Sequence, residues 1–381
     1  MNTFLEINLE KLQKNIRNLK SLLKPETKFL AVIKSNAYGH GLVECARAAN
    51  IAGANWFGVV YLEEAMELRC AGILKPILIL KMVASADARQ AANQEISIPI
   101  VSLAHAHEIS ETNFDKVLKV HLKVETGLNR FGLQICEISE AAKLLKTNRN
   151  IKIEGLYSHF ASVEENDLAH AKIQITNFKK AIKVLESTGT KNFLKHMAAT
   201  SATLLLPESH FNMVRCGIGI YGLWPSVENK EKYCSSPRGE NFLQPVLKYQ
   251  TYLSQIKTVE VGEKIGYGCT YEAKSKMTIG IIPVGYYEGL DRGLSNCGEV
   301  LISGTKCPII GRVCMNLSII DLSSLEGQSF CSFKDCPSPE VMIICKSVDQ
   351  EITADDIAQK IGSINYEVVT RIPACIERKY I

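Results

Sequence analysis

Apolar runs alternate with amphipathic stretches along the first two thirds of the chain. Short runs rich in β-branched or apolar residues predict eight strands, at Phe29–Ile33, Trp56–Val60, Ile77–Leu80, Ile98–Val101, Val117–Val124, Ile153–Tyr157, Phe193–Met197 and Met213–Tyr221. Helix-like stretches such as LEEAMELRCAG and LAHAKIQITNFKKAIKVLEST lie between them. Such alternation is typical of repeated βα units, and eight units indicate an N-terminal (β/α)8 barrel of the TIM type.

An open doubly wound sheet is the alternative, because spacing does not distinguish an open sheet from a closed one. No G-x-G-x-x-G motif follows the first strand, which argues against dinucleotide binding.

Ahead of that strand, Leu12, Ile16, Leu19 and Leu23 recur at helical spacing after Asn8, a good N-cap residue. We therefore expect an amphipathic helix before the barrel.

The pattern changes near the polar, turn-rich segment YCSSPRGE, residues Tyr233–Glu240. After it, alternating runs such as LKYQTYLSQIKTVEV and EVLISGTKCPIIGRV are separated by glycine-containing turns, which predicts a mainly β-strand domain. A short, well-capped helix is expected at Thr353–Ile361. The prediction is thus two domains, a barrel at residues 1–238 and a mainly β domain at residues 239–381.

Charge and composition limit the kinds of partner that we expect this protein to bind. The 44 basic and 40 acidic residues give a formal net charge of only +4 and are mixed along the chain, so nucleic acid is not an expected partner. The start MNTFLEINLE has no signal-peptide pattern, and we expect a cytoplasmic protein with no membrane partner. The 13 cysteines form no C-x-x-C pair, and His105 and His107 lack companion ligands, so we expect reduced thiols and no bound metal.

The segment KFLAVIKSNAYGHGL carries the most specific chemistry. It predicts an apolar strand with Lys34 at its carboxyl end, where the active sites of such barrels lie. A lysine among apolar neighbours can have a lowered pKa and attack a carbonyl carbon. The alternative for an isolated lysine here is a solvated surface residue, and the wider motif decides between the two.

That motif, AVIKSNAYGHG, resembles the cofactor-binding signature of the alanine racemases. The resemblance continues in family order through HLKVETGLNRFG, EGLYSHFAS, HMAATSAT, NMVRCGIGIYG, GYGCTYEA, IPVGYYEG, GRVCMN and INYEV. It implies that Lys34 holds pyridoxal 5'-phosphate and that Tyr38 contacts the phosphate. It also implies interconversion of L-alanine and D-alanine, which supplies D-alanine for bacterial peptidoglycan.

Racemisation needs an acid/base group on each face of the α-carbon. The resemblance assigns one face to Lys34 and the other to Tyr267, in GYGCTYEA. A phenol is a weak base at neutral pH unless positive charge or hydrogen bonding favours its phenolate. His159, in SHF, is similar to the family histidine beside that tyrosine.

The resemblance also supplies the remaining cofactor contacts. Arg215 matches the arginine that faces the pyridine nitrogen of the cofactor. Because arginine keeps its own proton at working pH, that ring nitrogen should stay unprotonated, and side reactions such as transamination should diminish. Gly217 and Ile218 resemble backbone N–H donors to the phosphate, and Tyr366 is a further phosphate contact. The family's phosphate-binding serine is replaced by Thr200 here, with Ser201 as the alternative hydroxyl.

For the substrate, Arg130 resembles the arginine that engages the carboxylate, and Lys123 occupies a position that is often carbamylated in the family. Met315 resembles a residue whose backbone N–H touches the carboxylate, and Tyr286 a tyrosine at the site entrance. The resemblance further implies a head-to-tail homodimer in which the partner subunit contributes Tyr267 and Met315.

Besides Thr200, the sequence departs from the family pattern in two places. Ala199 stands where the family has an asparagine, and Met315-Asn316-Leu317 replaces the usual Met-Asp-Gln, which exchanges a carboxylate for an amide. Ala199 removes one polar group from the site, and the change at Met315-Asn316-Leu317 weakens the expectation that alanine is the sole substrate, with serine as a second candidate. Two other functions compete: a pyridoxal-phosphate decarboxylase, and a non-catalytic carrier of the single-barrel type, which should lack the β domain and Tyr267.

Overall fold

The computed structural model describes residues 3–165, 167–235, 241–325, 339–346 and 350–381. The chain forms two compact units. The barrel unit comprises Leu9–Ala37 and the described parts of Leu42–Pro245; the β unit comprises the described parts of Met1–Asn8, Tyr38–Gly41 and Val246–Ile381. The expected domain boundary at 238/239 lies outside the described residues.

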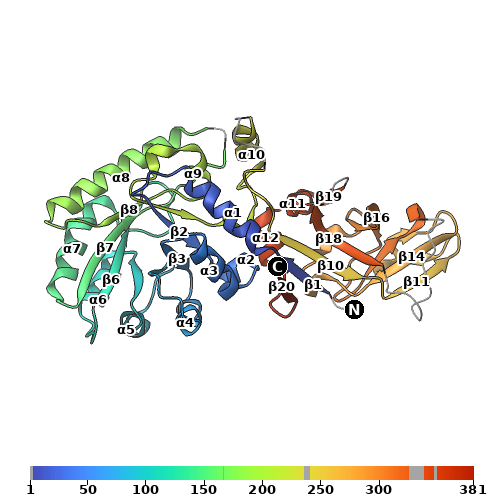
Figure 1. Cartoon of the computed structure of the whole chain (residues 1–381), viewed down its shortest axis with the longest axis horizontal. Helices are drawn as coiled ribbons and strands as arrows, with labels where there is room; N and C mark the ends of the chain where they lie inside the picture. The colour runs from blue at the N-terminus through green and yellow to red at the C-terminus, as the bar shows by residue number, and fades with distance from the viewer. Residues whose placement is uncertain (1–2, 166, 236–240, 326–338, 347–349) are drawn as a thin grey trace. The chain divides into compact units, whose positions relative to one another are not determined.

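The barrel unit contains a closed, all-parallel eight-stranded barrel, as predicted (Figure 1). Its strands are β2 (Lys28–Val32), β3 (Trp56–Val59), β4 (Ile77–Ile79), β5 (Ile96–Ile100), β6 (Leu118–Lys123), β7 (Ile151–Tyr157), β8 (Leu194–His196) and β9 (Met213–Cys216). Strand β9 pairs back onto β2, with Arg215 opposite Leu30, and this pairing excludes the open sheet. Because β3 and β4 are buried along their whole length, their sequences read as continuous apolar runs.

Helices surround this barrel (Figure 1). Those of the barrel unit are α1 (Leu9–Lys20), α3 (Leu42–Ile51), α4 (Leu62–Cys70), α5 (Ser85–Asn93), α6 (Leu103–Ser110), α7 (Ile138–Thr147), α8 (Ala169–Ser187), α9 (Thr200–Leu205) and α10 (Val227–Cys234). Helix α1 confirms the predicted amphipathic helix and buries Leu12, Ile16 and Leu19. It ends at Lys20, so Leu23 lies beyond it.

The last predicted strand is shorter than its apolar run. Strand β9 ends at Cys216, whereas the run continues to Tyr221. Residues Ile218–Tyr221 form the 3-10 helix η3, which ends at Gly222 in the left-handed conformation. The sequence does not show where the strand ends and the 3-10 helix begins, because both elements are buried and their residues are equally apolar.

The β unit is built on a ten-stranded sheet in the order β11-β14-β17-β16-β15-β18-β10-β1-β20, with β19 paired to β18. A separate ribbon joins β12 to β13. The strands are β1 (Phe4–Ile7), β10 (Leu247–Tyr252), β11 (Gln255–Val259), β12 (Lys264–Ile265), β13 (Tyr271–Glu272), β14 (Met277–Ile282), β15 (Glu299–Ile302), β16 (Thr305–Ile310), β17 (Ser318–Asp321), β18 (Glu340–Lys346), β19 (Glu351–Ile352) and β20 (Glu377–Tyr380). Strand β1 lies between β10, which is antiparallel to it, and β20, which is parallel.

Two α-helices of the β unit follow β19: α11 (Ala354–Ile361) and α12 (Asn365–Thr370). The Thr353 hydroxyl accepts a hydrogen bond from the Asp356 N–H at 3.0 Å, so the predicted cap is confirmed. Short 3-10 segments connect the remaining elements: η1 (Ile135–Glu137), η2 (Pro207–Ser209), η4 (Tyr267–Cys269), η5 (Tyr286–Glu288), η6 (Arg292–Leu294) and η7 (Ser323–Leu325).

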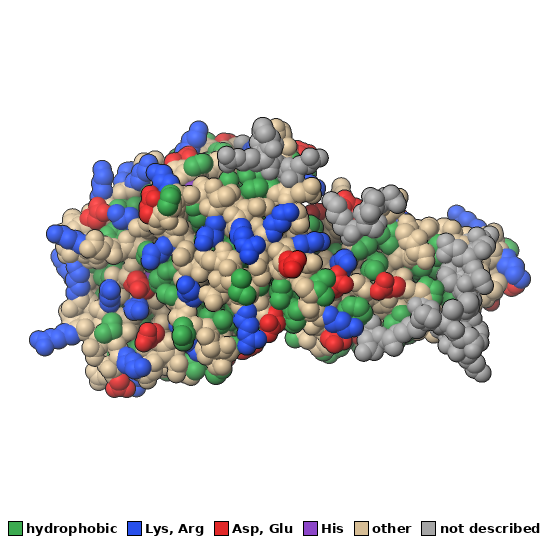
Figure 2. Space-filling view, in the orientation of Figure 1, with side chains coloured by type: hydrophobic (Ala, Val, Ile, Leu, Met, Phe, Trp, Pro, Cys, Tyr) green, Lys and Arg blue, Asp and Glu red, His purple; other side chains and the backbone are tan. Residues whose placement is uncertain are grey.

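The surface carries both signs of charge, and acidic and basic side chains are interspersed on the face shown in Figure 2. Among the residues that the structure describes, no helix combines the length and apolar character needed to cross a membrane. The same residues contain no cluster of three or more histidine, cysteine or acidic side chains suited to a metal ion.

Gly222 provides a stability test of the η3 turn. Its φ is 79°, and an added Cβ would lie 1.7 Å from the Gln244 carbonyl oxygen. Gly189 has nearly the same φ, 80°, but nothing within 4 Å of an added Cβ. We expect Gly222→Ala to lower the free energy of unfolding by about 2–3 kcal/mol more than Gly189→Ala, measured by urea denaturation. Equal losses would mean that the close approach is not a constraint.

Candidate active site

Five of the predicted side chains of the barrel unit come from the carboxyl ends of its strands. Lys34 follows β2, Lys123 ends β6, His159 follows β7, Thr200 follows β8 and Arg215 lies in β9. Parallel strands end at the same rim of a barrel, so these groups converge there. Their charges interact: Lys34 and Arg130 both help to lower the pKa of Lys123.

Lys34 is half-buried at the start of an unusual turn. Burial, followed by the positive charge of Arg130, lowers its pKa, and the carboxylate of Glu64 opposes that shift. The next four residues, Ser35 to Tyr38, all have left-handed backbone, with φ between 52° and 54°. None is glycine, and such backbone costs about 1–2 kcal/mol for each residue. This strained turn fixes the direction in which the chain leaves β2.

Arg215 is buried and fully engaged. Its guanidinium donates to His196 Nδ1 at 2.9 Å and His159 Nδ1 at 3.2 Å. It also donates to the carbonyl oxygens of Ser158 and Met197, at 2.8 and 3.2 Å. Burial lowers the pKa of Arg215 to about 10, so it remains a cation at neutral pH. The pKa of His159 lies well below its ordinary value because of burial and then of Arg215, which leaves this imidazole neutral.

The hydroxyl of Thr200 lies where two backbone donors point. Its Oγ1 accepts from the Gly217 N–H at 3.2 Å and from the Gly219 N–H at 3.5 Å, on either side of Ile218. The neighbouring Ser201 hydroxyl is instead bound to Glu164 at 2.6 Å. Thr200, rather than Ser201, therefore shares this turn with Gly217.

Lys123 is buried at the end of β6. Its ammonium nitrogen lies 5.4 Å from the Phe131 ring centroid and 5.6 Å from that of Tyr157. Burial, followed by the nearby Arg130 and Arg215 charges, lowers its pKa to about 8. A substantial fraction of this amine is thus neutral, and so nucleophilic, just above neutral pH.

Arg130 lies on an exposed loop that one carboxylate shapes. The Glu125 carboxylate accepts from the backbone N–H groups of Gly127, Leu128 and Arg130, at 2.5, 2.6 and 3.3 Å. Within the described parts of the chain, no hydrogen bond or ion pair engages the Arg130 guanidinium. Its planar fork is available for a small carboxylate.

Three predicted residues lie exposed in the β unit. Tyr267 begins η4 and is 72% exposed, while Met315 and Tyr286 are 55% and 44% exposed. Backbone hydrogen bonds from Tyr286 to Cys314 and from Tyr287 to Met315, at 3.0 and 2.9 Å, join the loops that carry Tyr286 and Met315.

Asn316 occupies the position at which the sequence departs from the family's Met-Asp-Gln. Its amide nitrogen donates to Glu288 Oε1 at 2.7 Å, and the other carboxylate oxygen of Glu288 accepts from the Gly285 N–H at 2.9 Å. An aspartate at position 316 could not donate this bond and would add a second negative charge. The amide therefore stabilises the loop that carries Tyr286.

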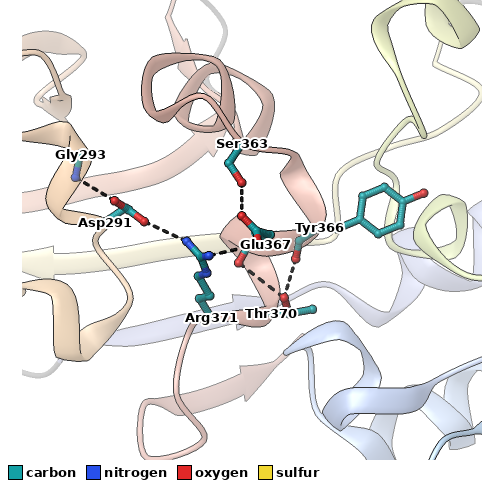
Figure 3. Close-up of polar contacts among 7 residues, drawn as sticks. All are labelled: Asp291, Gly293, Ser363, Tyr366, Glu367, Thr370 and Arg371. Atoms are coloured by element: carbon teal, nitrogen blue, oxygen red, sulfur yellow. Dashed lines mark hydrogen bonds and ion pairs between the residues drawn. The ribbon is translucent and has the colours of Figure 1, made fainter. Parts of the chain in front are cut away.

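Tyr366 lies on α12, in the β unit, and its ring centroid is 6.2 Å from that of Tyr38. The same helix is braced by Arg371, which pairs with Asp291 at 3.0 Å and Glu367 at 3.1 Å. Figure 3 shows the Tyr366 ring pointing away from this ionic cluster. A pocket of about 340 Å³ adjoins the cluster and is lined by Tyr286, Gly289, Asp291, Arg292 and Arg371.

Sequence reasoning missed several polar residues at these sites. Arg292 and Arg371 line the pocket, and His196 binds Arg215. A histidine within a predicted barrel strand was a usable signal for His196. The two arginines had no such signal, because they lie on short exposed segments of ordinary polarity.

Comparison with known proteins identifies the family. Residues 7–225 match the model of the alanine racemase N-terminal domain, and residues 246–380 match that of the alanine racemase C-terminal domain. The chain belongs to the alanine racemase family. It is accordingly an enzyme of the isomerase class.

Relatives from this family match over nearly the full length. An alanine racemase of Leptospira interrogans is 35% identical over 377 residues, which cover 99% of this chain and 95% of the relative. A solved alanine racemase from Bacillus anthracis, with L-Ala-P bound, has a TM-score of 0.91 and 32% identity, covering 100% of this chain and 95% of that one. The alanine racemase from E. faecalis gives a TM-score of 0.89 and 31% identity, covering 100% and 98%.

Buried neutral histidines predict the pH dependence of stability. Burial lowers the pKa of both His159 and His196 well below the ordinary value, whereas the unfolded chain protonates each near pH 6.5. Below that pH the unfolded state holds more protons, so the free energy of unfolding should fall between pH 7 and 5.5. Each such histidine contributes about 1.4 kcal/mol per pH unit. Denaturant titrations at several pH values would contradict this if stability rose on acidification.

Proposed function

We propose that this chain interconverts L-alanine and D-alanine with pyridoxal 5'-phosphate, using Lys34 and Tyr267 as the two acid/base groups. The observation that carries the proposal is the half-buried Lys34 amine, with its lowered pKa, at the rim that also bears Arg215 and Thr200. Membership of the alanine racemase family supports the choice of substrate.

The residues at the rim fit this cofactor chemically. Lys34 would hold it through Nζ, and the Thr200 hydroxyl with the N–H groups of Gly217 and Ile218 would bind its phosphate. Tyr38 and Tyr366, whose rings are neighbours, would add hydroxyl contacts to the phosphate. Arg215 would face the ring nitrogen with a guanidinium held by four neutral acceptors.

When bound, pyridoxal phosphate withdraws electrons from the substrate and acidifies its α C–H bond. Lys34 Nζ would then remove the α-proton from one face, and the hydroxyl of Tyr267 would deliver a proton to the other. The roles reverse for the opposite enantiomer. Arg215 donates to His159 Nδ1, so His159 carries its proton on Nε2, from which it can stabilise the phenolate of Tyr267.

The substrate carboxylate would be bound by Arg130, with the backbone N–H of Met315 as a second donor. Lys123 would orient Arg130 after carbamylation, in which the neutral amine adds carbon dioxide and releases a proton, leaving a carbamate anion. The pKa of about 8 at Lys123 supports this modification. Tyr286 would lie at the entrance through which the substrate arrives.

We further propose that the enzyme acts as a head-to-tail homodimer, in which each barrel rim receives Tyr267 and Met315 of the partner subunit. The large exposed fractions of both side chains in the single chain support this assignment. The reaction would take place in the cytoplasm and supply D-alanine for bacterial cell-wall peptidoglycan.

Lys34→Ala tests the cofactor assignment. We expect the rate of D-alanine formation to fall by at least about 1000-fold, because the variant loses both the covalent attachment and one base. Borohydride reduction of the wild-type holoenzyme, followed by peptide mapping, should locate the cofactor label on Lys34. Lys81→Ala, at an exposed lysine just beyond β4, serves as a matched control and should keep wild-type activity.

A label on another lysine, or full activity in Lys34→Ala, would refute the assignment. Carbon dioxide release without D-alanine would instead indicate the decarboxylase.

Mixed dimers test the shared site. Lys34→Ala and Tyr267→Phe subunits are each expected to form nearly inactive homodimers. A mixed dimer would contain one site with both an intact Lys34 and an intact partner's Tyr267. Free exchange of equal amounts should restore about a quarter of wild-type activity, because half of the dimers are mixed and each has one intact site. No recovery, with exchange verified by two affinity tags, would contradict a site built from both subunits.

A further inference from the structure

A line of polar side chains runs through the otherwise apolar interior of the barrel. Arg215 on β9 contacts His196 on β8 at 2.9 Å, and His196 Nε2 lies 2.9 Å from His121 Nδ1 on β6. His121 Nε2 lies 3.4 Å from Glu154 Oε2 on β7. That carboxylate oxygen also accepts from the Ser97 hydroxyl on β5, at 2.8 Å. Hydrogen bonds thus lead from Arg215 at the rim, through His196 and His121, to the carboxylate of Glu154.

The direction of these hydrogen bonds is fixed by chemistry. Arginine only donates, so His196 Nδ1 accepts, and the neutral ring carries its proton on Nε2. His196 Nε2 therefore donates to His121 Nδ1, which leaves the His121 proton on Nε2, facing Glu154. A second proton on either ring would set two donors against each other. These hydrogen bonds therefore connect a cation, Arg215, through two neutral imidazoles to an anion, Glu154.

Burial and ring packing hold this arrangement. His121 and His196 are completely buried, and burial lowers the pKa of each. Burial opposes ionisation of Glu154, but the hydrogen bonds from His121 and Ser97 and the charge of Lys119 outweigh it, so the pKa of this carboxyl is lowered. The Tyr157 ring stacks on His196, with centroids 4.9 Å apart.

Glycine 155 makes room for the histidine pair. A Cβ at this position would lie 2.2 Å from His121 Nδ1, the atom that accepts from His196. Glycine in a strand interior weakens the strand. Its presence beside Glu154 indicates that the space for this hydrogen bond is a requirement of the barrel.

The buried positive charge of Arg215 gives these hydrogen bonds a function, because a buried cation needs a compensating charge. A buried cation without a compensating charge is strongly destabilising. Among the described residues, the direct hydrogen-bond acceptors of the guanidinium are two carbonyl oxygens and two neutral imidazoles. Glu154 is the carboxylate to which hydrogen bonds connect it.

We propose that Glu154 is a positioning residue that acts through His121 and His196 as the remote counter-ion of Arg215. This inference rests on the proposed function, in which Arg215 faces the ring nitrogen of the cofactor. Glu154 holds the guanidinium charged and oriented. It thereby contributes both to cofactor affinity and to the preference for racemisation over transamination.

The test compares Glu154→Gln with wild type in the holoenzyme. The amide removes the charge and keeps the shape, and we expect kcat for racemisation to fall about tenfold, as for loss of a charged hydrogen-bond partner. The dissociation constant of pyridoxal phosphate, measured by absorbance, should rise by a similar factor. The ratio of pyruvate formed to D-alanine formed should rise, whereas general destabilisation would lower both products together. Glu154→Asp, which keeps the carboxylate, should recover part of each loss.

Glu186→Gln is the matched control. Glu186 pairs at the surface with Lys195, the neighbour of His196, so this change removes a carboxylate from the same region without touching the buried chain. It should leave the rate, the affinity and the product ratio unchanged.

A readout independent of activity uses 15N-histidine NMR of the wild-type protein, with signals assigned from His121→Asn and His196→Asn variants. Both rings should be neutral and protonated on Nε2. Either ring protonated on Nδ1, or Glu154→Gln with wild-type affinity and product ratio, would overturn the proposal. If wild type fails to racemise alanine, the proposed function fails, while the NMR result still decides whether the chain of hydrogen bonds exists.

Discussion

The buried guanidinium of Arg215 is the interaction on which the geometry of the rim depends. It binds backbone or imidazole acceptors contributed by β7, β8 and the residues that follow them, while its own backbone lies in β9 beside β2. Three adjacent strand ends are therefore tied to one planar cation. Barrel closure in turn brings β9 next to β2, and hence Arg215 near the segment that carries Lys34.

Positive charge and restricted solvent act together at this rim. Burial, followed by the positive charge of Arg130, lowers the pKa of both Lys34 and Lys123, and the charge of Lys34 adds to the effect at Lys123. A group of neighbouring cations is unfavourable by itself but suits anionic ligands. The same field keeps His159 neutral. Charge, rather than any one residue, thus prepares this surface for phosphate and carboxylate groups.

Much of the fold could be predicted from the sequence, because buried strands appear in it as runs of apolar residues. Each of the eight barrel strands falls on a predicted apolar run, and the family motifs supplied the candidate site residues of both units, which stay predictions. The left-handed turn at Ser35–Tyr38 could not be predicted, because of its four residues only Asn36 is of a type enriched in that conformation, and such residues normally adopt it singly. The contact between His121 and His196 joins residues 75 positions apart, and local patterns do not record such pairings. The same holds for β1, whose partners β10 and β20 are distant in sequence.

The position of β1 has a consequence for how the chain is made. This strand precedes the whole barrel in the sequence, yet it pairs with β10 and with β20 (Glu377–Tyr380), both of which follow the barrel. Closing so long a loop is entropically costly and slow. The barrel can form during synthesis, whereas β1 must wait, with unpaired edges, until β10 and β20 have been made. The nascent β unit is therefore the part of this molecule that most needs protection from aggregation before release.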